Sequence, residues 1–373
     1  MIQLYATLPS MIETLLQHRT RFLLVCSLLG PFAPAGQAAD PQPYTVDLKP
    51  TGNPALDGAL HDTSSLISLQ KTAPVGGFAL VARGQQDLQR FDTALNSFGY
   101  YKGHAELTID HRPVTDPALP DLIDRAPAEP PVPVEVQFNL GPQFHLGRVV
   151  LQGQVPLPAR SAPGLETGAP ARAADVLAAQ QRLLTALRNN GYPLAKVNLP
   201  PVTLRPAENA LDVTFDVQTG PRAPIGDITI TGLKDMNESF VRQRLLIHTG
   251  DEFSAAAIEK ARQDLASIGV FSVVRIEPAD KLDAQGRLPL TVDVTERPKH
   301  AVDVGAGYST DLGINFNVGW HDRNLFGNAE QLNLTGSVQL GGNALEKPGY
   351  QFNAQFIKPD FLARDQSLEL NLG

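Results

Sequence analysis

The segment Phe91–Tyr101, FDTALNSFGYY, carries the pattern that decides most of the fold. Its apolar residues lie three and four positions apart, and a glycine and two tyrosines follow, which predicts a helix that stops and a strand that begins. The pattern returns as LLTALRNNGY in Leu183–Tyr192 and as ARQDLASIGVF in Ala261–Phe271. The three glycines are roughly 80–90 positions apart, so the repeating unit is the size of a small domain rather than a solenoid turn.

The neighbourhood of each glycine predicts the rest of one unit. A helix commonly ends in a left-handed residue, which glycine adopts without Cβ strain. Strand-like runs follow at 195–199 and 211–217 in the second copy, and at 273–276 and 290–294 in the third, which opens on another strand at 226–233. The predicted order is strand, short helix, longer helix, strand, strand. The apolar stripes of the longer helices are Leu80, Gly84, Leu88, Phe91, Leu95 and Phe98; Val176, Ala179, Leu183 and Leu187; and Ile258, Ala261, Leu265 and Ile268.

The joints between the units repeat as well. Gly141–Gly147, GPQFHLG, ends the first unit, and Gly220–Gly226, GPRAPIG, ends the second. Glycine followed by proline indicates a turn, and the next strand begins directly after it. The segment Arg112–Pro133 differs from these short connections. It is rich in proline, alanine and acidic residues, and its composition predicts a long exposed loop between the last two strands of the first unit.

From Ala301 onward the residues alternate strictly between apolar and polar. Strands of about ten residues, apolar on one face and polar on the other, are typical of a transmembrane β-barrel. Ala301–Ser309 is expected to be the first of about five antiparallel strands. The polar positions hold mainly Asn, Gln, Ser and Thr, which favours a wet barrel lumen over the Lys- and Glu-rich face of a soluble sandwich. Phe316, Trp320, Leu334 and Phe352 are expected to face lipid, and Asn315, Asn333 and Asn353 the lumen.

The N-terminus has the pattern of an export signal. Arg19 and Arg21 precede an apolar core at Phe22–Leu29, and small residues at Gln37–Ala39 offer a cleavage site. Residues 1–39 are therefore predicted to be a signal peptide. Cys26 is the only cysteine and lies within it, so the exported chain has no thiol for a disulfide, a metal site or catalysis.

Composition and motifs argue against nucleic-acid binding and catalysis. The formal net charge of −8 gives no basic surface for nucleic acid. The chain has no HExxH pair, no GxSxG elbow and no phosphate-binding loop. His104, Glu106 and Asp110, with His111 beside them, would share a strand face, and a solvated surface explains them better than a metal site. His300 and His321 are expected at the barrel rim or lumen. No enzyme, cofactor or metal is predicted.

On these residues the chain resembles a known family. The three units, their Gly-Tyr-Tyr and Gly-Val-Phe steps and their Gly-Pro joints look like POTRA domains of BamA- and TamA-like outer-membrane assembly factors. Three units are closer to TamA than to the five of BamA or the two of two-partner secretion transporters. The resemblance implies α+β POTRA repeats followed by the first strands of an antiparallel transmembrane β-barrel. The implied domains are 40–141, 142–222, 223–298 and, for the barrel, 299–373.

The family's barrel has sixteen strands, so the resemblance implies that the chain ending at Gly373 is a fragment or a truncated product. It also implies an outer-membrane location with POTRA domains in the periplasm. Expected partners are unfolded outer-membrane clients of the autotransporter type, outer-membrane lipid and a TamB-like periplasm-spanning protein. Two alternatives stay open: a two-partner secretion pore, and a soluble periplasmic scaffold.

The first barrel strand is the candidate site, because in this family it meets the last strand at a weak seam. An exposed strand edge pairs with an incoming strand through its backbone. Two glycines lower the strand propensity and would help the seam to open, or they relieve barrel curvature. The candidate pairing residues are Val302, Asp303, Val304, Gly305, Ala306, Gly307 and Tyr308.

Overall fold

The computed structural model describes residues 41–73, 75–309, 313–340 and 348–373. The predicted signal peptide, residues 1–39, lies outside them. No helix in the described ranges is both long enough and apolar enough to cross a membrane. The chain divides into two compact units, one with residues up to Phe91 and Ala105–Phe138, the other with Asp92–His104 and Asn139–Gly373.

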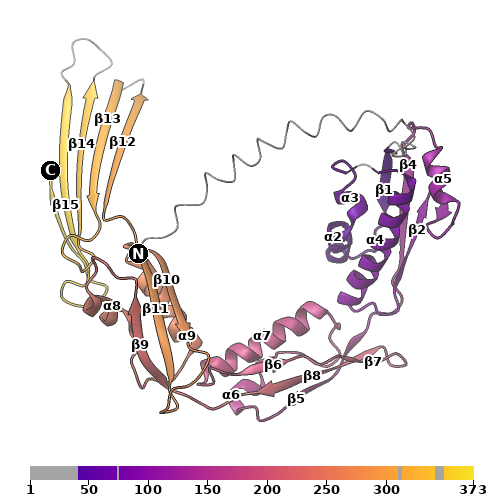
Figure 1. Ribbon diagram of the computed structural model, residues 1–373, viewed down its shortest axis with the longest axis horizontal. Coiled ribbons are helices and arrows are strands. Elements are labelled where there is room, and N and C mark those ends of the chain that lie inside the picture. Colours follow the sequence, from indigo (N-terminus) through magenta and orange to yellow (C-terminus); the bar gives the residue numbers. More distant parts are fainter. Residues whose placement is uncertain (1–40, 74, 310–312, 341–347) are drawn as a thin grey trace, which may run out of the picture. The chain divides into compact units, whose positions relative to one another are not determined.

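The predicted order of elements occurs three times (Figure 1). In each repeat the first strand pairs in parallel with the last strand: β1 with β4, β5 with β8, and β9 with β11. The strand after the longer helix, β2, β6 or β10, lies on the other side of that last strand. The first repeat contains β1 (Tyr44–Leu48), α2 (Pro54–Thr63), α3 (Ser65–Ser68), α4 (Gly77–Ser97), β2 (His104–Ile109), β3 (Arg112–Pro113), α5 (Leu119–Asp124) and β4 (Val132–Asn139). The second contains β5 (His145–Gln152), α6 (Leu157–Arg160), α7 (Ala173–Asn189), β6 (Lys196–Asn198), β7 (Thr203–Arg205) and β8 (Ala210–Gln218). The third contains β9 (Ile225–Thr231), α8 (Glu238–Leu245), α9 (Ala255–Ser267), β10 (Phe271–Pro278) and β11 (Leu288–Glu296).

The longer helices bury the stripes that the sequence predicts. Parallel strands need a crossover connection, and here the helices provide it while covering the sheet. All four predicted residues of α7 are buried, and in the third stripe only Ile268, which follows the end of α9, is partly exposed. In the first stripe, Leu88 of α4 and Phe98 just after it are half-buried and the rest is buried. The apolar periodicity therefore identified the core face of all three helices.

The glycine after each longer helix adopts a left-handed conformation, with φ of +90° at Gly99, +88° at Gly191 and +82° at Gly269. The first two also build the joints to the next repeat. Phe144 N donates to Gly99 O at 2.8 Å, and Ala223 N donates to Gly191 O at 3.0 Å. The end of one helix is thus hydrogen-bonded directly to the start of the following repeat.

The predicted exposed loop at Arg112–Pro133 is wrong over its first half. This segment forms β3 and α5, and Leu119 and Ile123 of α5 are buried. Leu119 and Ile123 are four residues apart and so lie on one face of a helical turn. The prolines and acidic residues around them hid this short apolar pattern. The stretch 127–131 is exposed, as expected.

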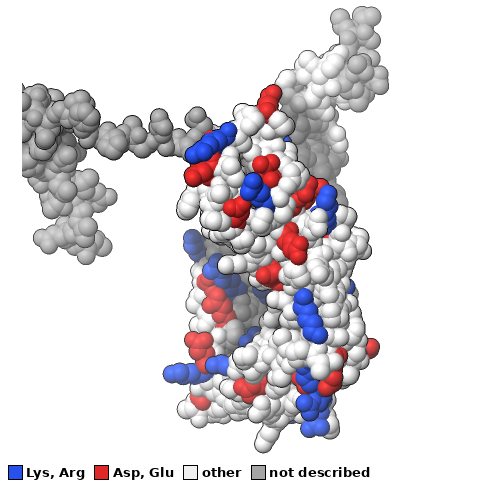
Figure 2. Space-filling model, turned by 90° about the vertical axis from the view of Figure 1, so that its right-hand side faces the viewer, with Lys and Arg blue, Asp and Glu red and all other residues white. Residues whose placement is uncertain are grey.

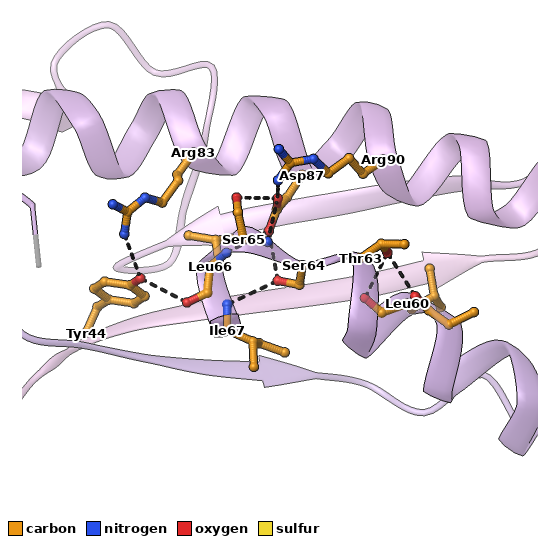
Figure 3. Close-up of polar contacts among 11 residues, drawn as sticks. Tyr44, Leu60, Thr63, Ser64, Ser65, Leu66, Ile67, Arg83, Asp87 and Arg90 are labelled. Carbon is orange, nitrogen blue, oxygen red and sulfur yellow. Dashed lines mark hydrogen bonds and ion pairs between the residues drawn. The ribbon is translucent and has the colours of Figure 1, made fainter. Parts of the chain in front are cut away.

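A buried carboxylate joins the helices of the first repeat (Figure 3). Asp87 of α4 accepts hydrogen bonds from Ser64 Oγ at 2.8 Å, from Ser65 N at 3.0 Å and Oγ at 2.7 Å, and from Leu66 N at 2.9 Å. Its side chain is fully buried and contacts Arg90. Burial alone would raise the pKa of Asp87, but the hydrogen bonds outweigh it and lower the pKa.

The C-terminal strands form a separate five-stranded antiparallel sheet in chain order (Figure 1). Each strand pairs with the next, as expected from the alternation. The sheet's edges in this structure are the first and last strands. The strands are β12 (His300–Ser309), β13 (Gly313–Asp322), β14 (Gln331–Leu340), β15 (Gly349–Lys358) and β16 (Leu368–Leu372).

Candidate functional site: the first edge of the five-stranded sheet

The candidate pairing residues all lie in β12, whose single strand neighbour in the described structure is β13. The ladder runs in unbroken antiparallel register from His300 opposite Asp322 to Ser309 opposite Gly313. Backbone groups on the outer side of β12 therefore have no ladder partner in this sheet. Such an edge can accept another strand through main-chain hydrogen bonds.

The register separates the side chains of the sheet into an apolar and a polar face. Each pairing in the sheet joins an even-numbered residue to an even-numbered one and an odd-numbered residue to an odd-numbered one. Within the five strands, all even-numbered residues therefore lie on the same face, which is the apolar one. The apolar face is open: Val304 is 79% exposed and Tyr350 is 76% exposed. A water-soluble sheet would cover such a face, because large exposed apolar patches mark sites of interaction. Other exposed members are Val302, Tyr308, Ile314, Phe316, Val318, Leu340, Phe352, Leu370 and Leu372.

The polar face carries a chain of side-chain contacts across four strands. Asp303 of β12 contacts His321 Nε2 of β13, and His321 Nδ1 lies 2.8 Å from Asn333 Oδ1 of β14. Asn333 Nδ2 then donates to Gln355 Oε1 of β15 at 3.0 Å. Asn333 lies directly opposite His321 and Gln355 in the register, whereas Asp303 reaches His321 diagonally. The sequence predicted the polar face but not this network, because the alternation does not say which strand positions lie opposite each other.

The glycines of β12 and β13 make room for these polar side chains. A Cβ on Gly305 would lie 2.5 Å from Oδ1 of Asn317, which is its direct partner in the register. A Cβ on Gly319 would lie 2.5 Å from Oδ1 of Asp303. Gly307 has no atom within 4 Å of its Cβ position. Gly305 thus leaves space that the amide of Asn317 occupies, and Gly307 has no such neighbour.

The histidine cluster of the first repeat does not form a shared strand face. His104 and Glu106 are exposed on β2, but Asp110 and His111 lie beyond its end with φ of +50° and +62°. The strand stops at Ile109 because the chain turns there toward β3. Within the described ranges, no three His, Cys, Asp or Glu residues are grouped so as to hold a metal ion.

On the face of the molecule in Figure 2, basic and acidic residues are interspersed.

A groove of about 670 Å³ lies where the second and third repeats meet. Its rim includes Lys196 of the short edge strand β6 and Pro278 at the end of the edge strand β10. The sequence gave no sign of the groove, which depends on how the joint folds. The other lining residues are Arg188, Pro193, Leu194, Ala195, Gln218, Gly220, Pro221, Ala279, Asp280 and Leu288.

In the comparison with known proteins, a family model matches the third repeat. The family model POTRA, described as a surface antigen variable number repeat, matches residues 223–297, which span β9 to β11. The third repeat is a POTRA domain. The first two repeats share its parallel pairing of first and last strands, so they have a POTRA-like topology.

The chain is similar in sequence to proteins named "Outer membrane protein assembly factor BamA". It is 29% identical over 150 residues to that of Neorickettsia risticii (strain Illinois), covering 40% of this chain and 20% of the relative. It is 20% identical over 208 residues to that of Neisseria meningitidis serogroup B, covering 55% and 26%. The chain therefore spans about a fifth to a quarter of the length of these relatives.

A solved structure has a similar fold. The crystal structure of BamA from Haemophilus ducreyi lacking POTRA domains 1-3 superposes with a TM-score of 0.52 at 20% identity, over 61% of this chain and 42% of that one. This likeness shows a common fold. The POTRA match and the BamA-named relatives relate the sequence of the chain to the BamA/Omp85 superfamily.

Proposed function

We propose that this chain is the periplasmic arm and the first barrel strands of an outer-membrane protein that assembles other outer-membrane proteins. The repeats lie in the periplasm and the five-stranded sheet lies in the membrane. The relatives' name, outer membrane protein assembly factor, supports both the location and a non-enzymatic activity.

The observation that carries the proposal is the two-faced sheet with an open first edge. Its apolar face is exposed over all five strands, as lipid contact requires, and its opposite face is rich in amides. Open backbone groups are costly in lipid, so the outer edge of β12 needs a strand partner. An incoming client strand provides one through Val302–Tyr308.

The proposal extends to clients and partners. The clients are outer-membrane proteins of the autotransporter type, delivered unfolded. The three-repeat organisation, with boundaries near Gly141, Gly220 and Pro298, is that of TamA, and it motivates a TamB-like partner that spans the periplasm. Outer-membrane lipid surrounds the sheet, and the edge strands of the repeats take up client segments by adding them to their sheets.

The test compares backbone and side-chain changes at one point of β12. Neighbouring residues of a strand direct their N–H groups to opposite sides, so one of Asp303 and Val304 donates toward β13 and the other toward the open edge. Proline removes this donor, whereas alanine keeps it. Four variants of the full protein, Asp303→Pro, Asp303→Ala, Val304→Pro and Val304→Ala, would be reconstituted in liposomes and client folding followed by gel shift.

We expect the proline at the edge-facing position to slow client folding at least tenfold while the sheet stays intact by circular dichroism. The alanine variant at the same position should assemble clients normally. Wild-type client folding by the edge-facing proline variant would contradict pairing at this edge. Transport of one dedicated exoprotein, without insertion of any client, would favour a two-partner secretion pore, and a protein that stays in the aqueous phase would favour a soluble scaffold.

A further inference from the structure

Two turns of the five-stranded sheet dock onto the helices of the third repeat. The first turn, residues 323–330, joins β13 to β14, and the second, residues 359–367, joins β15 to β16. Both lie at the end of the sheet where β12 leaves the third repeat. All of these residues belong to the same compact unit. Neither set of contacts is required by strand pairing.

The first turn is fixed by asparagines on both sides. Asn237, the residue before α8, donates from its backbone N to Gly327 O at 2.8 Å and from Nδ2 to Asn328 Oδ1 at 3.0 Å. In return, Asn324 Nδ2 donates to Asp235 O at 3.0 Å. The fit is close at Gly327, where φ is +98° and a Cβ would lie 2.6 Å from Asn237 Nδ2.

The burial of its residues shows that the first turn packs into the interior of the third repeat and does not merely touch its surface. Ala329 is fully buried and belongs to the hydrophobic core of the third repeat. Asn324 and Glu330 are 3% and 2% exposed. Buried polar groups need partners, and Ala329 N donates to Asn324 Oδ1 at 3.0 Å while Asn328 N donates to Glu330 Oε2 at 2.9 Å.

The second turn is held by three ion pairs, two to an arginine of α8 and one from an arginine of the turn to α9. Arg244 of α8 is 9% exposed, and its Nη1 lies 2.8 Å from Asp360 Oδ1 and 3.0 Å from Asp365 Oδ1. Arg364 of the turn returns a contact, with its Nη2 2.6 Å from Asp264 Oδ2 on α9. Exposed ion pairs contribute little, but removing one partner of a buried pair leaves the other charge uncompensated. Arg244 is therefore the critical member.

We propose that Asn237 and Arg244 are positioning residues that join the third repeat and the sheet into one rigid body. The two contacts hold separate turns against one pair of helices, so the sheet cannot swing about the Arg297–Lys299 joint without breaking at least one of them. The direction of the β12 edge relative to the POTRA domain is thereby fixed. Its consequence for client assembly rests on the proposed function, but the rigidity itself does not.

The test is a distance distribution between spin labels in the full protein in detergent. Labels on Lys260→Cys in α9 and Thr335→Cys in β14 occupy exposed positions in the two parts. Arg244→Gln removes the buried cation. Arg242→Gln is the matched control, since Arg242 lies on the same helix and pairs at its surface with Glu238. Asp365→Asn, at a partner that is 70% exposed, is a milder variant that leaves the core intact.

We expect a narrow distribution in the wild type and in Arg242→Gln, and at least a twofold broader one in Arg244→Gln, with Asp365→Asn between them. A broad wild-type distribution, or a folded Arg244→Gln variant with the wild-type width, would overturn the proposal. If Arg244→Gln does not fold, the width in Asp365→Asn decides. Client folding is measured in parallel, so that the proposed function and the positioning role are tested separately. If the wild-type protein does not fold clients, the proposed function alone is contradicted. If a variant with a broadened distance distribution folds clients at the normal rate, the positioning role is overturned.

Discussion

At the scale of single residues, Asp87 shows how one carboxylate organises a repeat. Its oxygens accept hydrogen bonds from Ser64, Ser65 and Leu66, which form the start of the short helix α3 (Figure 3). The sequence placed Asp87 between apolar positions of α4 but did not predict its burial. A helical apolar stripe identifies neighbours in the core by spacing, whereas a polar partner on another element leaves no periodic signal.

We predict that Asp87→Asn destabilises the first repeat by about 1–3 kcal/mol, because buried donors lose a charged acceptor. The folded pKa of Asp87 is lowered, so its stabilisation is complete above the ordinary aspartate value of about 3.9 and is lost as pH falls below it. The difference between variant and wild type should shrink below about pH 4. Urea unfolding, read by pulsed hydrogen exchange of peptides spanning residues 54–97, measures it. Asp92→Asn, at an exposed position of the same helix, should change nothing.

A second residue-scale prediction concerns the faces of the sheet. Leu334 lies on the apolar face and Thr335 beside it on the polar face. In the full-length protein, Leu334→Arg should cost roughly 2–4 kcal/mol if the residue lies near the bilayer midplane, and Thr335→Arg far less. Thr335 is a cleaner control than Asn333, whose side chain contacts His321 and Gln355. Equal costs in urea unfolding from liposomes would argue against a membrane sheet.

At the scale of elements, the sequence predicted most of the helices and strands but missed α5. The α7 stripe and the alternation over β13 to β15 are long enough for their periods to be recognised. The helix α5 has too few residues for its period to be recognised, and the surrounding prolines made the segment resemble a loop. The groove at Lys196 and Pro278 could not be predicted from the sequence either, since it depends on a joint between two folded repeats.

The corrected structure of Arg112–Pro133 changes where proteolysis should begin. Residues 127–131 are exposed, whereas Leu119 and Ile123 anchor α5 in the core. We expect limited trypsin digestion to cut first after Arg125, next to the exposed stretch, and before any cut in α7. Mass spectrometry of the first fragments identifies the site. Early cleavage after Arg182, which lies within α7, would contradict the helix assignment.

At the scale of the whole molecule, three repeats precede a sheet of a different kind. The switch from helical to two-residue periodicity after Arg297–Lys299 predicted this division, and the strand pairings confirm the five-stranded sheet. The sequence did not predict the docked turns at Asn237 and Arg244. Their partners are about 90 and 120 positions away along the chain, and no pattern of spacing links them.

The most direct test of the account is disulfide cross-linking during assembly. Single cysteines along Val302–Tyr308 would be combined with single cysteines in the last strand of an autotransporter-type client, in the full protein in cells. The account predicts cross-links that appear during assembly, follow one antiparallel or parallel register and disappear when the client is released. Absence of cross-links along β12, together with cross-links to polar-face residues such as Asn317, would contradict pairing at the edge and indicate passage through a pore.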